Sequence, residues 1–152
     1  MAPWARNVVL LTEVGGTRYL PVWVGQWEGD SIALLLEKVK VPRPLTHTFI
    51  AALLKASGVR VDQVRIHRLA EKTFYAEVAL HRPTGPASVD ARPSDCIALA
   101  LELEAHVYVA AEVLAAVEAI RADKPMPPMG AAHIVAELLA KWPDSAKPAA
   151  ND

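Results

Sequence analysis

The sequence predicts an α+β domain in which helices pack on a mixed or antiparallel sheet. Short runs of β-branched and aliphatic residues, such as "NVVLLT", alternate with segments whose apolar residues recur at helical spacing, such as "SIALLLEKV". Hydrophobic residues make up 53% of the 152 residues and charged residues 22%, which is typical of a globular chain. This length suits one domain with a hydrophobic core and is short for two.

The first part of the chain is expected to form a hairpin followed by two helices. Gly15-Gly16 suits the tight turn of the hairpin, and Pro21 predicts a free edge or a bulge in its second strand. Thr46 is the expected N-cap of the second helix and Gly58 its C-terminal stop. The expected strands and helices cover residues 7–12, 18–24, 29–38 and 46–57. The residues assigned to the inner face of the second helix are Phe49, Ile50, Leu53 and Leu54.

The second part of the chain alternates strands with helices and ends in two appended segments. Residues 1–122 form the main domain, and the Pro-rich residues 123–130 are interpreted as a linker. An apolar stripe predicts a helix over 131–142 that either docks on the core or contacts a protein partner, followed by a disordered tail over 143–152. The expected strands cover residues 59–69, 73–80, 87–90 and 106–110, and helices follow the last two of them.

Two segments that each follow a strand and open a helix resemble one another. "VGQWEGDSIALLLE" (24–37) and "VDARPSDCIALALE" (89–102) share seven of fourteen residues at an offset of 65. The pattern predicts a duplicated hairpin-plus-helix unit; chance is the alternative, because Ala and Leu are common in helices. A duplication would relate the two strand-to-helix junctions by a rough two-fold axis.

The composition argues against several classes of protein. The net charge of −1 lacks the strongly basic character of a dedicated nucleic-acid binder. No stretch approaches the ~20 apolar residues of a membrane span, and the N-terminal apolar run is too short for a signal peptide. We therefore expect a soluble cytoplasmic protein with no membrane contact. The single cysteine, Cys96, is expected to be a buried, inert thiol.

The segment "VDARPSD" (89–95) concentrates polar residues where a strand turns into a helix. Helix capping explains Asp90, Ser94 and Asp95, because acids and hydroxyls satisfy the first N–H groups and complement the helix dipole. Arg92 does not fit that explanation, since the same dipole disfavours a cation at a helix start. Arg92 therefore needs an acid or a bound phosphate as its partner.

Three other polar residues are candidates with ordinary alternatives. Glu28 lies near the start of the first helix, where an acid also compensates the dipole. His47 lies in the first turn of the second helix, and a lone His is more often structural than a ligand; Arg43 precedes it. The chain contains no P-loop, GxGxxG, HExxH or CxxC motif. Spacing alone indicates a soluble α+β domain with a polar cluster.

Five motifs resemble those of the bifunctional nuclease domain family over about residues 7–111. They are "RYLPVWVGQWEG", "VPRPLTH", "VRIHRL", "TFYAEV" and "DARPSDCIALAL", in the order and spacing of that family. The resemblance implies an α+β fold, a homodimer or higher homo-oligomer and, for some members, hydrolysis of both DNA and RNA. The family usually has Asp where this chain has Thr48, and Ala where it has Cys96. The family's polar motif residues match Glu28, Arg43, Thr46, His47, Asp90, Arg92, Ser94 and Asp95.

The cluster and the resemblance together predict a nuclease with little sequence preference. Catalytic roles are assigned to Glu28, His47, Asp90 and Asp95, of which the three acids would hold Mg²⁺ or Mn²⁺. Substrate contacts are assigned to Arg43, Arg92 and Ser94. The alternative is a non-enzymatic, oligomeric binding or regulatory module whose cluster holds an anion or braces the fold. The near-neutral net charge and the missing acid at Thr48 favour this alternative.

Overall fold

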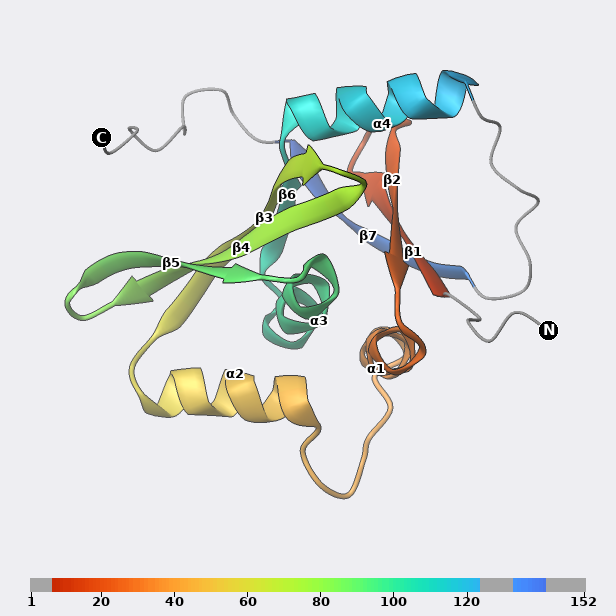
Figure 1. Cartoon of the computed structure of the whole chain (residues 1–152). Helices are drawn as coiled ribbons and strands as arrows, with labels where there is room; N and C mark the ends of the chain where they lie inside the picture. Colours follow the sequence, from red (N-terminus) through yellow and green to blue (C-terminus); the bar gives the residue numbers. More distant parts are fainter. Residues whose placement is uncertain (1–6, 124–132, 142–152) are drawn as a thin grey trace.

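The computed structural model describes residues 7–123 and 133–141 and confirms the α+β class (Figure 1). Its helices are α1 (Gln26–Leu36), α2 (Thr46–Ala56), α3 (Pro93–Leu103) and α4 (Ala111–Asp123). Its strands are β1 (Asn7–Glu13), β2 (Tyr19–Val24), β3 (Arg60–Ala70), β4 (Thr73–Arg82), β5 (Gly85–Ala91), β6 (His106–Val109) and β7 (His133–Lys141). No helix in the described ranges is long and apolar enough to cross a membrane.

The strands are hydrogen-bonded in the order β2-β1-β7-β6-β3-β4-β5. The pairs β1–β2, β3–β4 and β4–β5 are antiparallel, whereas β6 runs parallel to β3 and makes that part a mixed four-stranded unit. The predicted mixed sheet is therefore confirmed. Pro21 lies on β2, an edge strand, where its missing N–H leaves no ladder hydrogen bond unmade.

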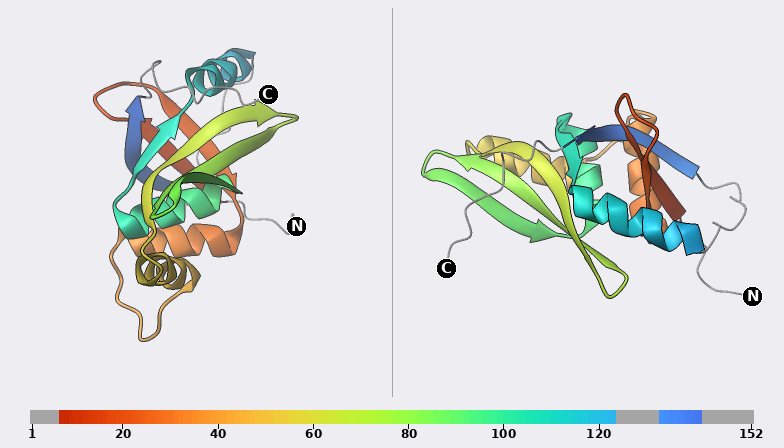
Figure 2. Two further views of the ribbon diagram at one scale, coloured as in Figure 1. Left: turned by 90° about the vertical axis from the view of Figure 1, so that its left-hand side faces the viewer. Right: turned by 90° about the horizontal axis from the view of Figure 1, so that it is seen from above.

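Helix α3 occupies the centre of the hydrophobic core. Cys96 and Ile97 are completely buried, and α3 packs on β3 and β4 with one side and on α1 and α2 with others. Helices α2 and α4 lie at opposite sides of the molecule (Figures 1 and 2). Because α3 contacts the sheet, α1 and α2, its N-terminus is fixed in position relative to both helices.

The predicted helix over 131–142 is wrong: His133–Lys141 forms strand β7. Apolar periodicity cannot distinguish a short helix from a strand, and here the pairing partners decide. β7 runs parallel to β1 on one edge and to β6 on the other, so it satisfies backbone groups of both. Asp123 still belongs to α4, and the rest of the predicted linker and the tail over 143–152 lie outside the described residues.

Helix α2 differs from the prediction in its cap and in its buried face. Leu45 is the N-cap and no side chain caps the helix, so Thr46 is the first helical residue. Phe49 and Leu53 are 60% and 55% exposed, and Ile50 is also exposed, whereas Ala51 is buried. The helix instead directs polar side chains at α3, which turns its apolar stripe outward. Gly58, with φ of +69°, ends this segment as predicted.

The duplication is not shown by the structure. Helices α1 and α3 both begin after an extended N-cap residue, Gly25 and Arg92, that follows a strand, and the two helices pack together. A shared layout of this kind is common wherever a strand leads into a helix. The duplicated unit therefore stays a prediction.

Candidate functional site

Arg92 is the N-cap of α3 and the centre of the polar cluster. Its backbone is extended (φ −67°, ψ 146°), Pro93 follows at the helix start, and no side chain caps the helix. The carboxylate of Asp95 accepts two hydrogen bonds from Arg92, at 2.7 Å from Nε and 3.1 Å from Nη2. Asp95 therefore makes no cap hydrogen bond, because its side chain binds the guanidinium, although its charge still lies in the first turn, where it complements the helix dipole.

Glu28 brings the first strand-to-helix junction to the second. It lies in the first turn of α1, and its Oε1 accepts a hydrogen bond of 2.8 Å from Nη1 of Arg92. The two residues are 64 positions apart and meet because α1 packs along α3. The acids of the two junctions therefore share one guanidinium.

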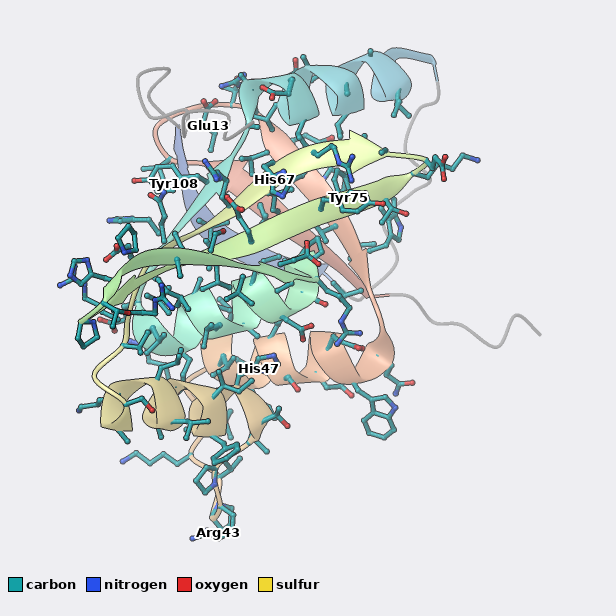
Figure 3. All side chains as sticks on the ribbon, turned by 60° about the vertical axis from the view of Figure 1, so that its left-hand side comes forward. Glu13, Arg43, His47, His67, Tyr75 and Tyr108 are labelled. Atoms are coloured by element: carbon teal, nitrogen blue, oxygen red, sulfur yellow. The ribbon has the colours of Figure 1, made fainter. Side chains whose placement is uncertain are left out.

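His47 joins the same group from α2, while Arg43 does not. Nε2 of His47 lies 3.4 Å from Oδ1 of Asp95, and the His47 side chain is 12% exposed. Arg43 lies at the tip of the loop before α2, away from His47 (Figure 3). No hydrogen bond or ion pair links Arg43 to the group among the described residues. We call Glu28, His47, Arg92 and Asp95 the Arg92 cluster.

Charge within the Arg92 cluster stabilises the ionised forms. Burial would raise the pKa of the Asp95 carboxyl, but the hydrogen bonds and charge of Arg92, followed by those of His47, outweigh burial and lower it. The hydrogen bond and charge of Asp95, followed by those of Glu28, raise the pKa of Arg92. Asp95 is thus an anion and Arg92 a cation throughout the physiological range.

A cleft of about 420 Å³ opens beside the cluster. Its walls come from the end of β2 and start of α1, the turn between β3 and β4, and the junction of β5 with α3. Asp90 is exposed there, whereas Ser94 is buried. The cluster members that line it are Glu28 and Arg92. The remaining lining residues are Val22, Trp23, Val24, Gly25, Lys72, Thr73, Phe74, Tyr75, Asp90, Ala91, Pro93 and Ser94.

The donor set fits a metal ion only in part. Among the described side chains, which run from residue 8 to residue 120, no group of three or more His, Cys, Asp and Glu could hold a metal. Mg²⁺, however, is usually held by one or two carboxylates together with substrate phosphate. Glu28 and Asp90 line one cleft and could supply those carboxylates, although Glu28 is already bound to Arg92. The Mg²⁺ or Mn²⁺ site stays a prediction.

Several site features were not predicted from the sequence. Thr48, at the position where the family of the motifs usually has Asp, donates a hydrogen bond of 3.0 Å to Glu102. Trp23 and Trp27 are 52% and 80% exposed. Lys72 lines the cleft although nothing in its local sequence distinguishes it from other turn lysines. Only the pairing of strands distant in sequence reveals such neighbours.

The chain belongs to the bifunctional nuclease domain family, whose model matches residues 9–121. Two similar proteins come from Mycobacterium tuberculosis: uncharacterized protein MT1877 of strain CDC 1551 / Oshkosh and uncharacterized protein Rv1829 of strain ATCC 25618 / H37Rv. Each is 46% identical over 113 residues, which cover 74% of this chain and 67% of the relative. The matched region contains the whole Arg92 cluster and every residue that lines the cleft.

Proposed function

We propose that this chain hydrolyses phosphodiester bonds in DNA and RNA, with the substrate phosphate bound at the N-terminus of α3. The observation that carries the proposal is that this helix start has no side-chain cap, bears Arg92 and lines a cleft. The first N–H groups of a helix and its positive dipole end are a ready site for phosphate. Membership of the bifunctional nuclease domain family supports the same reaction class.

Arg92 is the residue best suited to hold the phosphate. A guanidinium binds two phosphate oxygens at once, and 65% of the Arg92 side chain is exposed to an incoming ligand. Glu28 and Asp95 hold this guanidinium from two sides and so fix its direction before substrate arrives. Preorganised charge of this kind stabilises the additional negative charge of a phosphoryl-transfer transition state.

Asp90 is our candidate for the proton acceptor. It is exposed, lines the cleft and makes none of the hydrogen bonds or ion pairs found among the described side chains. A water molecule would attack phosphorus, lose its proton to the Asp90 carboxylate and displace the departing sugar oxygen. A Mg²⁺ or Mn²⁺ ion held by Asp90 and Glu28 would add positive charge on the phosphate oxygens.

His47 is assigned a positioning role in this proposal. Its side chain is largely buried, does not line the cleft and contacts Asp95. That placement does not suit the acid–base role expected from the sequence, which requires access to the reacting atoms. His47 instead holds the carboxylate that orients Arg92.

Cleavage of single-stranded DNA and RNA by purified protein tests the proposal, with added Mg²⁺ or Mn²⁺ and with chelator. We expect Asp90→Asn and Asp95→Asn to lose on the order of 100-fold or more in rate. Asp62→Asn is the matched control, because Asp62 is an exposed strand acid paired with Arg60 outside the cleft. Equal cleavage by all four proteins would mean a contaminating nuclease and would remove the proposal's support.

A non-enzymatic module is the second candidate. The observation that favours it is that Glu28 and Asp95 already neutralise Arg92, so the group can act as a brace between α1 and α3. In that case Asp95→Asn lowers the melting temperature, inorganic phosphate does not raise it in either protein, and no cleavage is seen. Phosphate-dependent stabilisation that is lost in Arg92→Ala, with no cleavage by wild type, would instead indicate an anion-binding module.

A further inference from the structure

Three aromatic residues are among those that line the cleft that contains Arg92. Trp23 comes from the end of β2, and Phe74 and Tyr75 come from the start of β4. β2 is the last strand at one end of the sheet, and β4 is the second strand from the other end. Their meeting at one cleft places aromatic residues beside charged groups that suit phosphate.

Trp23 is the most accessible of the three rings. Its neighbours Val22 and Val24 are 3% and 6% exposed, and because strand side chains alternate, Trp23 points away from the core with 52% of its surface exposed. An indole left half in solvent on an ordered strand is an unused stacking surface. Trp23 is among the residues that line the cleft, so a ligand bound there lies next to this position of β2.

Tyr75 and the turn next to it complete the cleft. The guanidinium carbon of Arg68 lies 4.0 Å from the centroid of the Tyr75 ring, so a cation covers one face of this ring and holds it. Lys72, in the β3–β4 turn, lines the same cleft and can neutralise a second phosphate. Aromatic rings beside Arg and Lys are the combination that binds single-stranded nucleic acid, because every base has a π-face.

We infer that the cleft takes one unpaired nucleotide, with its base stacked on Trp23 and its phosphate at Arg92, and that the protein therefore selects single-stranded DNA or RNA over duplex. A volume of 420 Å³ is in the range of small-ligand sites and is too small for a base pair with its neighbours. A base within a duplex is already stacked on both sides and cannot reach the indole. The inference rests on the proposed function, which identifies the ligand as nucleic acid, and adds that this nucleic acid is single-stranded.

Binding of a fluorescent oligothymidylate with a cleavage-resistant phosphorothioate backbone tests the inference by polarisation. An abasic strand with the same backbone and a duplex of equal length are the comparison ligands. We expect wild type to bind oligothymidylate about tenfold more tightly than the abasic strand, which is the effect of one stacked base. Trp23→Ala should bind both strands equally, and Trp23→Phe should keep most of the difference. Trp27→Ala, which removes an 80% exposed indole outside the cleft lining, is the matched control and should bind as wild type does.

Each outcome separates the inference from the proposed function. Unchanged binding by Trp23→Ala, equal binding of the abasic strand by wild type, or preference for duplex overturns the inference. If any of these occurs while Asp90→Asn still abolishes cleavage, the proposed function stands without it. Trp23-dependent binding with no cleavage by wild type would overturn the hydrolase proposal and leave a single-strand-binding site.

Discussion

Arg92 and Glu28 lie 64 positions apart in the chain, yet Nη1 of Arg92 donates a hydrogen bond of 2.8 Å to Oε1 of Glu28. The contact joins the N-terminal turn of α1 to that of α3, and Asp95 holds the same guanidinium from within α3. A cation at a helix start is unfavourable on its own, and the two carboxylates remove that penalty. The arrangement therefore keeps a guanidinium at the helix start where the proposed phosphate would bind.

A double-mutant cycle between Glu28→Gln and Arg92→Ala measures this contact. We expect a coupling free energy of about 0.5 kcal/mol, because Arg92 is 65% exposed and solvent screens the pair. The coupling should decrease as salt is added. Urea unfolding of the four proteins at low and high salt provides the measurement, and additive effects at low salt would mean that the pair does not link the helices.

The stability contributed by Asp95 should depend on pH in a defined direction. Its pKa in the folded protein lies below the ordinary value of 3.8, so the contribution is complete above that value and is lost as the pH falls through the folded pKa. Asp95→Asn should therefore be less stable than wild type at neutral pH, by about 1 kcal/mol at most since the carboxylate is partly exposed. Thermal melts of both proteins from neutral pH downward should converge below pH 3.8. A gap that stays constant over this range would contradict the assignment.

Cys96 should be unreactive in the native protein. The side chain is completely buried in α3, and burial, followed by the charges of Asp95 and Asp90, raises the pKa of its thiol to about 12. Almost no thiolate exists at neutral pH, and the thiolate is the reactive form. A thiol reagent should modify the chain only in denaturant, and the measurement is unambiguous because the sequence has one cysteine. Rapid modification under native conditions would show that α3 opens or that its packing differs.

Most strands and the family were predictable from local sequence, whereas strand β7, the tertiary contacts and the buried faces were not. The β-branched runs that become β1, β3 and β4 carry their own signal, as does the motif that opens α3. The meeting of Glu28 with Arg92 depends on how α1 packs on α3, which no local pattern encodes. Asp95 illustrates the limit: its position at a helix start suggested a cap, and only the neighbouring guanidinium explains where its carboxylate goes.

The exposed face of α2 should tolerate polar substitution. Phe49 is 60% exposed, so Phe49→Gln should change the free energy of unfolding by no more than about 0.5 kcal/mol. Ile97→Ala, in the buried centre of α3, should cost about 2–5 kcal/mol and is the comparison. Urea unfolding and size-exclusion chromatography at several protein concentrations provide the measurement. A large, concentration-dependent loss in Phe49→Gln would indicate that the predicted homo-oligomer covers this face.

Removal of β7 should destabilise the whole domain. β7 pairs with β1 along one edge and with β6 along the other, so its loss leaves backbone groups of both strands without partners. Val9 of β1 and Val107 of β6 are completely buried, and these strands cannot move apart or take up water without disturbing the core. Deletion of residues 124–152 should therefore abolish cooperative melting by circular dichroism, whereas deletion from residue 142 onward leaves every described strand in place and is the control. The sequence left two alternatives open for this segment, docking on the core or a contact with a protein partner. A strand that is paired on both edges has no free edge for a partner strand, so the structural role and the partner contact are alternatives. An unchanged melting temperature after the longer deletion, together with loss of a co-purifying partner, would support the partner contact.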